Sequence, residues 1–228
     1  MGKLGVVFDM DDTLYFERDY VKSGFRAVAS AVADQTNVPE ADAFALLWGH
    51  FEAGTRGTTF DELLARYPKI GASLTIPDLV TVYREHAPTI ELLPEMEALL
   101  LELRAQGVPL GVITDGPYVS QRAKADALRL EDYADTVILT DTWGKDFWKP
   151  HPKAFEEASK ALGLPPENLV YIGDNPSKDF DAPAQLGWQS VRLRLSEQLR
   201  FEHGDGEYRP TKEVRSVAEL RKFLSQLK

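Results

Sequence analysis

Short aliphatic runs alternate with helix-period segments along most of this chain, and that alternation limits the folds open to it. The runs have the length and the branched composition of buried strands. Strands that alternate with amphipathic helices are joined by right-handed crossovers, which build a parallel sheet covered by helices on both faces. We therefore predict an α/β fold with a doubly wound parallel sheet. Its five strands are expected at Leu4 to Phe8, Pro109 to Ile113, Thr136 to Leu139, Leu169 to Ile172 and Ser190 to Leu193.

Glycine marks the ends of several of the intervening helices. Residues 96 to 103 place four apolar side chains on one helical face, and Gly107 follows as the stop. Gly163 and Gly187 stand at the ends of two more such segments. Glycine is the residue that most readily takes the left-handed conformation that closes a helix, so these positions support the predicted boundaries.

Residues 17 to 88 interrupt the alternation, because they carry helical patterns and no convincing strand. We interpret them as a small α-helical domain inserted into a core domain built from residues 1 to 16 and 89 to 228. The polar stretch from 196 to 213 is predicted to be a loop, and the final helix is expected to start near Ser216. The helices of the insertion are predicted at Tyr20 to Asp34, Glu40 to Glu52, Phe60 to Tyr67 and Ile76 to His86.

The chain is acidic, since 26 Lys and Arg stand against 36 Asp and Glu and leave a net charge of -10. Nucleic-acid binding depends on basic residues that release counterions from phosphates, so no nucleic-acid partner is expected. The chain contains no cysteine, which excludes disulfides and thiolate chemistry. The apolar stretch near the N-terminus is too short for a signal peptide or a membrane span, so a cytoplasmic protein with no membrane partner is expected.

Paired carboxylates follow two of the predicted strands. Asp9 and Asp11 come directly after the first strand, and residues two apart in an extended chain project to the same side. Asp174 ends another strand, and Asp179 follows in the turn. The carboxyl ends of parallel strands share the sheet edge where open α/β folds bind ligands. Carboxylates held this close need a proton or a hard cation, and an all-oxygen ligand set favours Mg²⁺, which we predict as the cofactor.

Two further segments are predicted to surround this metal site. Thr114 and Asp115 follow the second strand and offer a hydroxyl and flanking amides for phosphate binding, and Lys149 precedes a helix in the segment FWKPHP. A phosphoryl group in transfer spreads negative charge over its oxygens, so fixed donors and a cation stabilise the transition state. These residue types in this order favour phosphoryl transfer.

Four segments, FDMDDTL, VITDG, KPHP and GDNPSKD, resemble in order and context the four motifs of the haloacid dehalogenase superfamily. The resemblance spans nearly the whole core. It implies a Rossmann-like core domain, and it identifies the helical insertion after the first motif with the α-helical cap of that superfamily.

The resemblance also implies roles for individual residues. Asp9 would attack phosphorus, and Asp11 would protonate the leaving oxygen and then activate water for the aspartyl-phosphate. Thr114 and Lys149 would hold the phosphoryl group. The implied groups around the magnesium ion are the Asp9 carboxylate, the Asp11 backbone carbonyl and the Asp174 carboxylate, with Asp179 contacting a water on the ion.

Two residues depart from the pattern of the superfamily. Asp12 stands where many members have glycine, and Asp115 stands where asparagine is frequent. Neither departure removes a catalytic group, but an acid beside a phosphate site must point away, donate through its backbone or bind a substrate hydroxyl. Trp143 and Trp148 flank the lysine motif, and because aromatic residues near a strand end usually pack in a core, we predict that role for both.

The sequence therefore predicts a magnesium-dependent phosphatase that hydrolyses a small soluble phosphorylated metabolite through an aspartyl-phosphate. Sugar phosphates, phosphoglycolate-like acids and nucleoside monophosphates all remain open, as does the oligomeric state. The nearest alternative is a phosphomutase resembling β-phosphoglucomutase, which shares every core motif. A non-catalytic binding module is a second alternative, which the intact motif residues disfavour. Specificity is expected to come from the insertion, with Arg56 in a glycine-rich turn as the best candidate.

Overall fold

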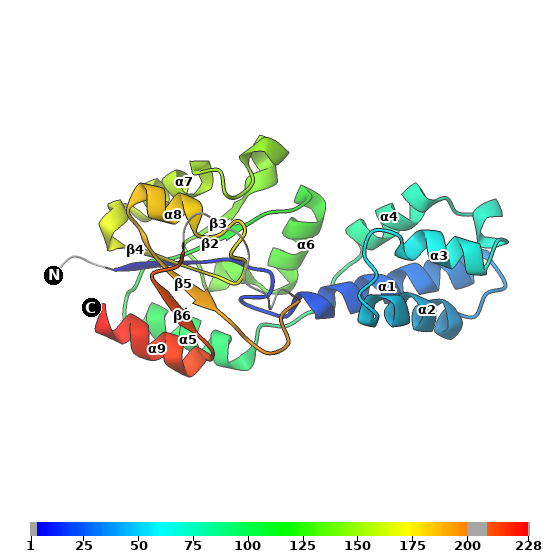
Figure 1. The fold of residues 1–228 in the computed structure, drawn as a ribbon, viewed down its shortest axis with the longest axis horizontal. Helices are drawn as coiled ribbons and strands as arrows, with labels where there is room; N and C mark the ends of the chain where they lie inside the picture. Colours follow the sequence, from blue (N-terminus) through cyan, green and yellow to red (C-terminus); the bar gives the residue numbers. More distant parts are fainter. Residues whose placement is uncertain (1–3, 200–208, 228) are drawn as a thin grey trace. The chain divides into compact units, whose positions relative to one another are not determined.

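The computed structural model describes residues 4–199 and 209–227. The chain divides into two compact units, one of Met1–Arg18 with Ile90–Lys228 and one of Asp19–Thr89. The first unit contains the sheet, and the second, all of whose residues are described, contains helices and no strand (Figure 1). That the second unit acts as a cap stays a prediction.

The described residues of the first unit form a six-stranded parallel sheet in the order β3-β2-β1-β4-β5-β6. The β1 strand has the sequence GVVF with every residue buried, which suits the centre of a sheet covered on both faces. The prediction of a doubly wound parallel sheet is confirmed. The strands are β1 (Gly5–Phe8), β2 (Leu110–Thr114), β3 (Thr136–Leu139), β4 (Leu169–Gly173), β5 (Gln189–Leu193) and β6 (Lys212–Val214).

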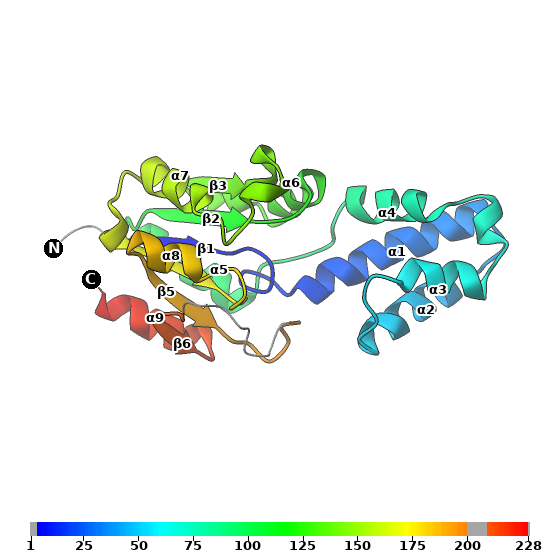
Figure 2. The same cartoon turned by 45° about the horizontal axis from the view of Figure 1, so that its top comes forward.

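Helices cover both faces of this sheet. The α7 and α8 helices lie on one face, and α5 and α9 lie on the other (Figure 2). On the first face, Phe155 of α7 makes edge-to-face contacts with Tyr171 of β4 and with Trp188, in one buried cluster. The helices of the unit are α5 (Pro94–Ala105), α6 (Tyr118–Ala127), α7 (Lys153–Leu162), α8 (Asp181–Leu186) and α9 (Val217–Gln226), with 3-10 turns at Leu130–Asp132, Thr140–Trp143, Lys145–Phe147 and Pro166–Asn168.

The predicted helix stops are confirmed. Gly163 closes α7 and Gly187 closes α8, with φ values of 64° and 83°, and Gly107 just beyond α5 has φ of 69°. A side chain would strain the backbone at such φ values, which is why glycine marks these ends. Ser216 caps α9 by accepting a hydrogen bond from the Glu219 amide, as the predicted start of the final helix requires.

The prediction of a loop from 196 to 213 is wrong at its end, where β6 pairs with β5 through Lys212, Glu213 and Val214. Only Val214 of the three is buried. Charged residues are common on edge strands, where they discourage pairing with other chains, and three residues are too few to show a period of two. Residues 200–208 of the same stretch lie outside the described residues.

The second unit has the helical character that its sequence pattern predicts. The α1 helix begins before the predicted Tyr20, and the other boundaries differ by one residue or less. The buried leucines Leu47, Leu63 and Leu79 come from three different helices of the unit. The elements are α1 (Glu17–Gln35), α2 (Glu40–Glu52), α3 (Thr59–Arg66), a 3-10 turn at Ile70–Ala72 and α4 (Ile76–Glu85).

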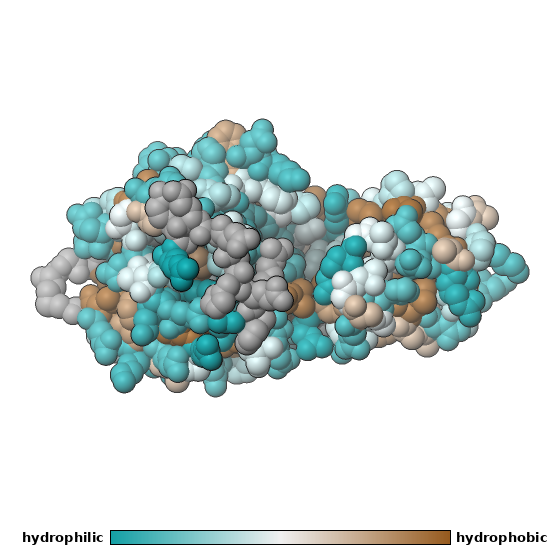
Figure 3. Space-filling model, viewed as in Figure 1, coloured by the Kyte–Doolittle hydropathy of each residue, from teal (hydrophilic) through white to brown (hydrophobic). Residues whose placement is uncertain are grey.

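Hydrophilic residues make up most of the surface of the first unit in the view of Figure 3, in keeping with the acidic composition. On the second unit, hydrophobic residues reach the surface at several places in the same view. Among the described residues, no helix combines the length and the apolar character needed to cross a membrane.

Gly24 allows a close approach inside the second unit. A Cβ atom built there would lie 2.5 Å from the Tyr83 ring, closer than real Cβ contacts come. That ring is itself held by edge-to-face contacts with Tyr20 and Phe60 and by a tilted contact with Phe25. The α1 helix therefore needs a residue without a side chain where it meets Tyr83.

We expect Gly24→Ala to lower the free energy of unfolding by about 1–3 kcal/mol, because the methyl group overpacks a ring that cannot move aside. Gly49→Ala in α2 is the matched control, since nothing lies within 4 Å of the added Cβ. There the better helix propensity of alanine should stabilise the chain by roughly 0.5–1 kcal/mol. Thermal and urea unfolding of both variants would check the opposite signs, and equal shifts would contradict the close approach.

Candidate active site

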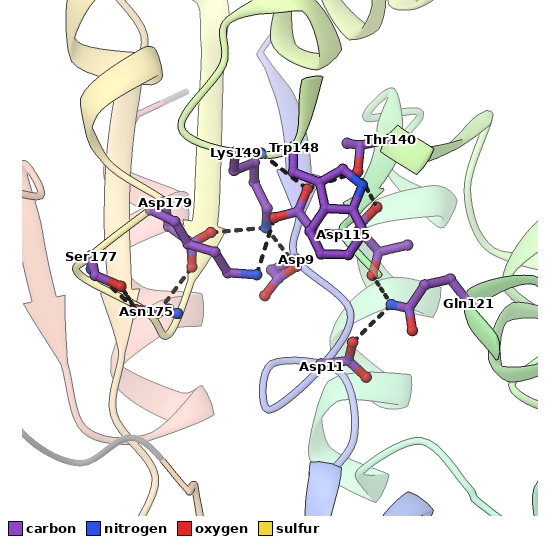
Figure 4. A network of polar contacts seen from close by, with 12 residues as sticks. Asp9, Asp11, Asp115, Gln121, Thr140, Trp148, Lys149, Asn175, Ser177 and Asp179 are labelled. Carbon is purple, nitrogen blue, oxygen red and sulfur yellow. Dashed lines mark hydrogen bonds and ion pairs between the residues drawn. The ribbon is translucent and has the colours of Figure 1, made fainter. Parts of the chain in front are cut away.

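Three adjacent strands end at one edge of the sheet and carry the predicted site residues there. The β1 strand pairs with both β2 and β4, so their carboxyl ends are neighbours. Asp9, which is labelled in Figure 4, directly follows β1, while Thr114 ends β2 and Asp174 directly follows β4. The topology thus brings together residues that are far apart in the sequence, at the edge where open α/β sheets bind ligands.

A cavity of about 300 Å³ opens at this edge. Of the predicted site residues, Asp9, Asp11, Asp115, Lys149 and Asp174 line it, while Thr114 lies fully buried beside it. The complete lining consists of Asp9, Asp11, Asp12, Glu17, Asp115, Trp148, Lys149, Asp174, Asn175, Ser177 and Lys178.

The two tryptophans that flank the lysine motif have different surroundings. Trp143 packs against the buried cluster around Phe155, as predicted. Trp148, by contrast, lines the cavity, and its indole Nε1 donates a 3.1 Å hydrogen bond to Asp141 Oδ1. The core prediction is therefore wrong for Trp148. The ring that lines the cavity is held by this hydrogen bond to Asp141, and sequence spacing does not reveal such a contact.

Lys149 is the central cation of the site. Its Nζ donates to Asp9 Oδ1 at 2.7 Å, to the Tyr171 hydroxyl at 2.7 Å and to Asp179 Oδ1 at 2.8 Å. An ammonium group has three N–H donors, so these contacts use all of them. The side chain is completely buried, and the Coulombic attraction of Asp179 and then Asp9 outweighs burial and raises the pKa of Lys149 well above its ordinary value.

Three buried carboxylates form a group beside this lysine. Oxygen atoms of Asp9, Asp174 and Asp179 all lie within 4.8 Å of one another. Burial is the main cause that raises the pKa of Asp9 to about 6, against the lowering effect of Lys149. Burial, followed by the charges of Asp179 and Asp9, raises the pKa of Asp174 well above its ordinary value. Carboxylates whose charges are this costly fit a divalent cation with oxygen ligands, so the donor set is suited to Mg²⁺.

Asp179 differs from the other two because both of its oxygens have partners within the chain. Oδ1 accepts from Lys149, and Oδ2 accepts a 2.9 Å hydrogen bond from the Asn175 amide. The backbone of the same loop is held from the other side, where Arg192 Nε donates to the Asp174 carbonyl at 3.1 Å. Asp9 and Asp174 are therefore the carboxylates best placed to bind an ion directly.

Asp11 is held by a different set of residues. Its carboxylate accepts hydrogen bonds from the Tyr15 hydroxyl, from Gln121 Nε2 at 2.8 Å and from Lys124 Nζ at 2.8 Å. Burial alone would raise the pKa of Asp11, but the Lys124 charge and these hydrogen bonds lower it below its ordinary value. Gln121 Nε2 also donates to the Thr114 hydroxyl, so α6 links the ends of β1 and β2.

Asp12 has a backbone conformation that glycine adopts readily. Its φ of 53° lies in the left-handed region. Its carboxylate accepts from the amides of Glu17 and Leu199, each at 2.8 Å. Burial, opposed by these two hydrogen bonds, raises the pKa of Asp12 to about 6.

The Asp115 carboxylate lines the cavity and accepts hydrogen bonds from three different segments. Oδ1 accepts from the Thr140 hydroxyl at 2.8 Å and from the Lys149 amide at 3.1 Å, and Oδ2 accepts from Lys178 Nζ at 3.2 Å. Burial would raise the pKa of Asp115, but the charges of Lys149 and Lys178 lower it. The acid that stands in place of asparagine is therefore ionised and paired.

Several residues of the site were not predicted from the sequence. Lys178 directly precedes Asp179 in GDNPSKD, so its place in a motif was a usable signal. Gln121 and Lys124 are three residues apart on α6, which puts them on one helical face, but no local pattern ties that face to Asp11. The contacts of Tyr171 follow only from the pairing of β4 with β1.

The sequence of the chain is similar to those of known proteins. A family model for haloacid dehalogenase-like hydrolases matches residues 4–187. The chain is 31% identical over 228 residues to glyceraldehyde 3-phosphate phosphatase from Methanocaldococcus jannaschii, with 98% of each chain covered. It is 28% identical to the protein of the same name from Methanopyrus kandleri, with 97% of each covered.

Solved structures show the same fold. A haloacid dehalogenase-type phosphatase from Thermococcus onnurineus superimposes with a TM-score of 0.60 at 24% identity, covering 97% of each chain. The hydrolase YfnB from Bacillus subtilis, solved bound to magnesium, gives a TM-score of 0.63 at 19% identity over 97% of this chain and 98% of its own. With the match to the family model and the full-length similarity to named phosphatases, the chain belongs to the haloacid dehalogenase-like hydrolases and is a phosphatase.

Proposed function

We propose that the chain hydrolyses a small soluble phosphomonoester with the help of Mg²⁺, through a transient phosphate ester on Asp9. The observation that carries this proposal is the pairing of a buried carboxylate, Asp9, with the Lys149 ammonium inside a cavity of about 300 Å³. A cavity of that size suits a metabolite rather than a folded protein substrate.

The proposed ligands of the ion are the carboxylates of Asp9 and Asp174 and the backbone carbonyl of Asp11, and Asp179 would contact a water on the ion. The ion would neutralise these carboxylates and polarise the phosphoryl oxygens. The grouping of Asp9, Asp174 and Asp179 supports this assignment. Lys149 contacts Asp9 and Asp179 with its single positive charge, so three grouped carboxylates leave negative charge for a divalent ion to neutralise.

In the proposed first step, a carboxylate oxygen of Asp9 attacks phosphorus and the bond from phosphorus to the leaving oxygen breaks. Lys149 holds Asp9 in the attacking orientation through its 2.7 Å contact with Oδ1. Asp11 gives a proton to the leaving oxygen. Asp11 must be protonated for this step. The negative charge of the bound phosphoryl group favours that proton, because it opposes the lowering effect of Lys124 on the pKa of Asp11.

In the second step, water attacks the aspartyl-phosphate, Asp11 accepts the proton of that water, and phosphate leaves with Asp9 restored. Splitting hydrolysis in this way replaces one difficult displacement by two easier ones. Thr114 and Lys149 are proposed to hold the phosphoryl group. Because all three N–H groups of Lys149 are engaged, Lys149 has to exchange one partner to contact a phosphoryl oxygen.

The second unit is proposed to act as a cap that selects the leaving group and excludes bulk water. Arg56 is the residue that the sequence suggests for this role. Its guanidinium donates through Nη1 to the carbonyls of Phe51 and Thr55 and lies 4.2 Å from the Phe51 ring centroid. Among the described residues these hydrogen bonds use Nη1, so Nε and Nη2 stay available for a substrate anion and Arg56 remains the proposed specificity residue.

For the substrate, the names of the similar proteins favour glyceraldehyde 3-phosphate, a three-carbon phosphate ester, as the first compound to test. The test measures inorganic phosphate released from glyceraldehyde 3-phosphate, phosphoserine, phosphoglycolate, a sugar phosphate and a nucleoside monophosphate. Phosphate release from one of them supports the hydrolase proposal. Conversion to an isomeric phosphate without phosphate release would instead assign a phosphomutase.

We expect Asp9→Asn to lower turnover by at least ~10³-fold, because the amide cannot act as the nucleophile. Treatment with EDTA should abolish activity, and added Mg²⁺ should restore it. Asp146→Asn, at an exposed acid of the same unit, is the matched control and should behave like the wild-type chain. Near-normal turnover by Asp9→Asn, or full activity in EDTA, would contradict the proposed mechanism.

Asp11→Asn should separate the two acids of the first motif by role. We expect a greater loss of turnover with an alkyl phosphate than with p-nitrophenyl phosphate, whose leaving group departs without protonation. Stabilisation of the fold by Mg²⁺ should persist, because Asp11 is proposed to contact the ion through its backbone. Equal losses on both substrates would contradict the assignment of Asp11 as the general acid.

A further inference from the structure

The acids that line the cavity outnumber the positive charges assigned to it so far, those of Lys149 and of the proposed Mg²⁺ ion. The lining of the cavity includes six acids and two lysines, Lys149 and Lys178. A phosphoryl dianion entering it meets strong repulsion unless cations face it. Lys149 has all three N–H donors committed to Asp9, Tyr171 and Asp179, so its charge is already shared.

Lys178 is placed differently. Its side chain is 27% exposed, against 0% for that of Lys149, and it lines the same cavity. Within residues 4–199 and 209–227, its single hydrogen-bond partner is Asp115 Oδ2 at 3.2 Å. The Lys178 ammonium therefore keeps two N–H donors for a ligand.

Asp115 gives this lysine a fixed anchor. The other carboxylate oxygen of Asp115 accepts from the Thr140 hydroxyl and the Lys149 amide, so the carboxylate cannot turn freely. A flexible lysine that is tied to a fixed acid loses less conformational entropy when it binds a ligand. The pairing also explains how an acid can stand beside a phosphate site, since Lys178 offsets its charge.

We propose that Lys178 binds the phosphoryl group of the substrate directly and that Asp115 is the residue that positions it. This inference rests on the proposed phosphatase reaction and adds to it a phosphate-binding residue. The ammonium contacts an oxygen that every phosphate ester has in common, so its contribution does not depend on the leaving group. Lys149 then holds Asp9 and Asp179, and it contacts the phosphoryl group only by exchanging one of its partners.

The test measures binding of inorganic phosphate, in the presence of Mg²⁺, by isothermal titration calorimetry. Lys178→Met should raise the Kd for phosphate at least about tenfold, the loss of a charge-assisted hydrogen bond. It should also lower kcat/KM for p-nitrophenyl phosphate and for the preferred ester by a common factor. Lys222→Met, which removes the same charge from an exposed position on α9, is the control and should bind phosphate like the wild-type chain.

Variants of Asp115 distinguish phosphate binding from a purely structural ion pair. Asp115→Asn keeps an acceptor for Thr140 and Lys149, and it should change the Kd by no more than about fivefold, the range for a partly exposed ion pair. The double variant with Lys178→Met should stay at least about tenfold weaker than the wild-type chain. If the double variant binds phosphate normally, Lys178 serves only to neutralise Asp115 and the proposal is overturned.

Two further outcomes would also overturn it. One is an unchanged Kd in Lys178→Met, and the other is a loss of kcat/KM confined to one ester, which would place Lys178 on the leaving group. Turnover of the wild-type chain is measured in parallel. Failure of the proposed function then shows as absent hydrolysis, whereas failure of this assignment shows in the phosphate affinities.

Discussion

The site depends on one buried ammonium group. Lys149 joins three segments that reach it from different directions: Asp9 after β1, Tyr171 within β4 and Asp179 in the loop after β4. Burying a carboxylate or an ammonium group alone would cost several kcal/mol per charge. The three contacts of Lys149 offset this cost, because they pair every N–H donor of the buried ammonium group. Because each partner is also fixed by the sheet or by a backbone amide, the lysine sets the place of the attacking carboxylate rather than merely offsetting its charge.

The two lysines of the cavity, Lys149 and Lys178, have different roles. Lys149, which is completely buried, fixes the positions of protein groups. Lys178, which is partly exposed, keeps N–H donors for a ligand. The acids divide in the same way. Asp115 and Asp179 are satisfied by the chain itself, whereas Asp174 has a pKa raised by burial and by its acidic neighbours and gains most from an external cation. A bound cation thus supplies Asp174 with the positive charge that the chain itself supplies to Asp115 and Asp179.

Much of the fold and the location of the site could be predicted from the sequence, because both follow from local patterns. Aliphatic runs mark the central strands, and a carboxylate directly after such a run, as at Asp9 and Asp174, must lie at the carboxyl edge of a parallel sheet. What escaped prediction depends on contacts between distant segments. The orientation of Trp148 rests on Asp141, the anchoring of Asp11 rests on α6, and the short β6 is defined only by its pairing with β5.

Asp12 shows how a strained residue can be retained. Its left-handed backbone is unfavourable for most residues with a side chain, and Asp12 offsets this because its carboxylate accepts from the amide of Glu17, the first residue of α1, and from the amide of Leu199. Glycine would relieve the backbone and release both amides. A chain with glycine at this position would need other acceptors for the start of α1 and for the Leu199 amide. A substitution of Asp12 therefore affects three segments at once: the first motif, the start of α1 and the backbone at Leu199.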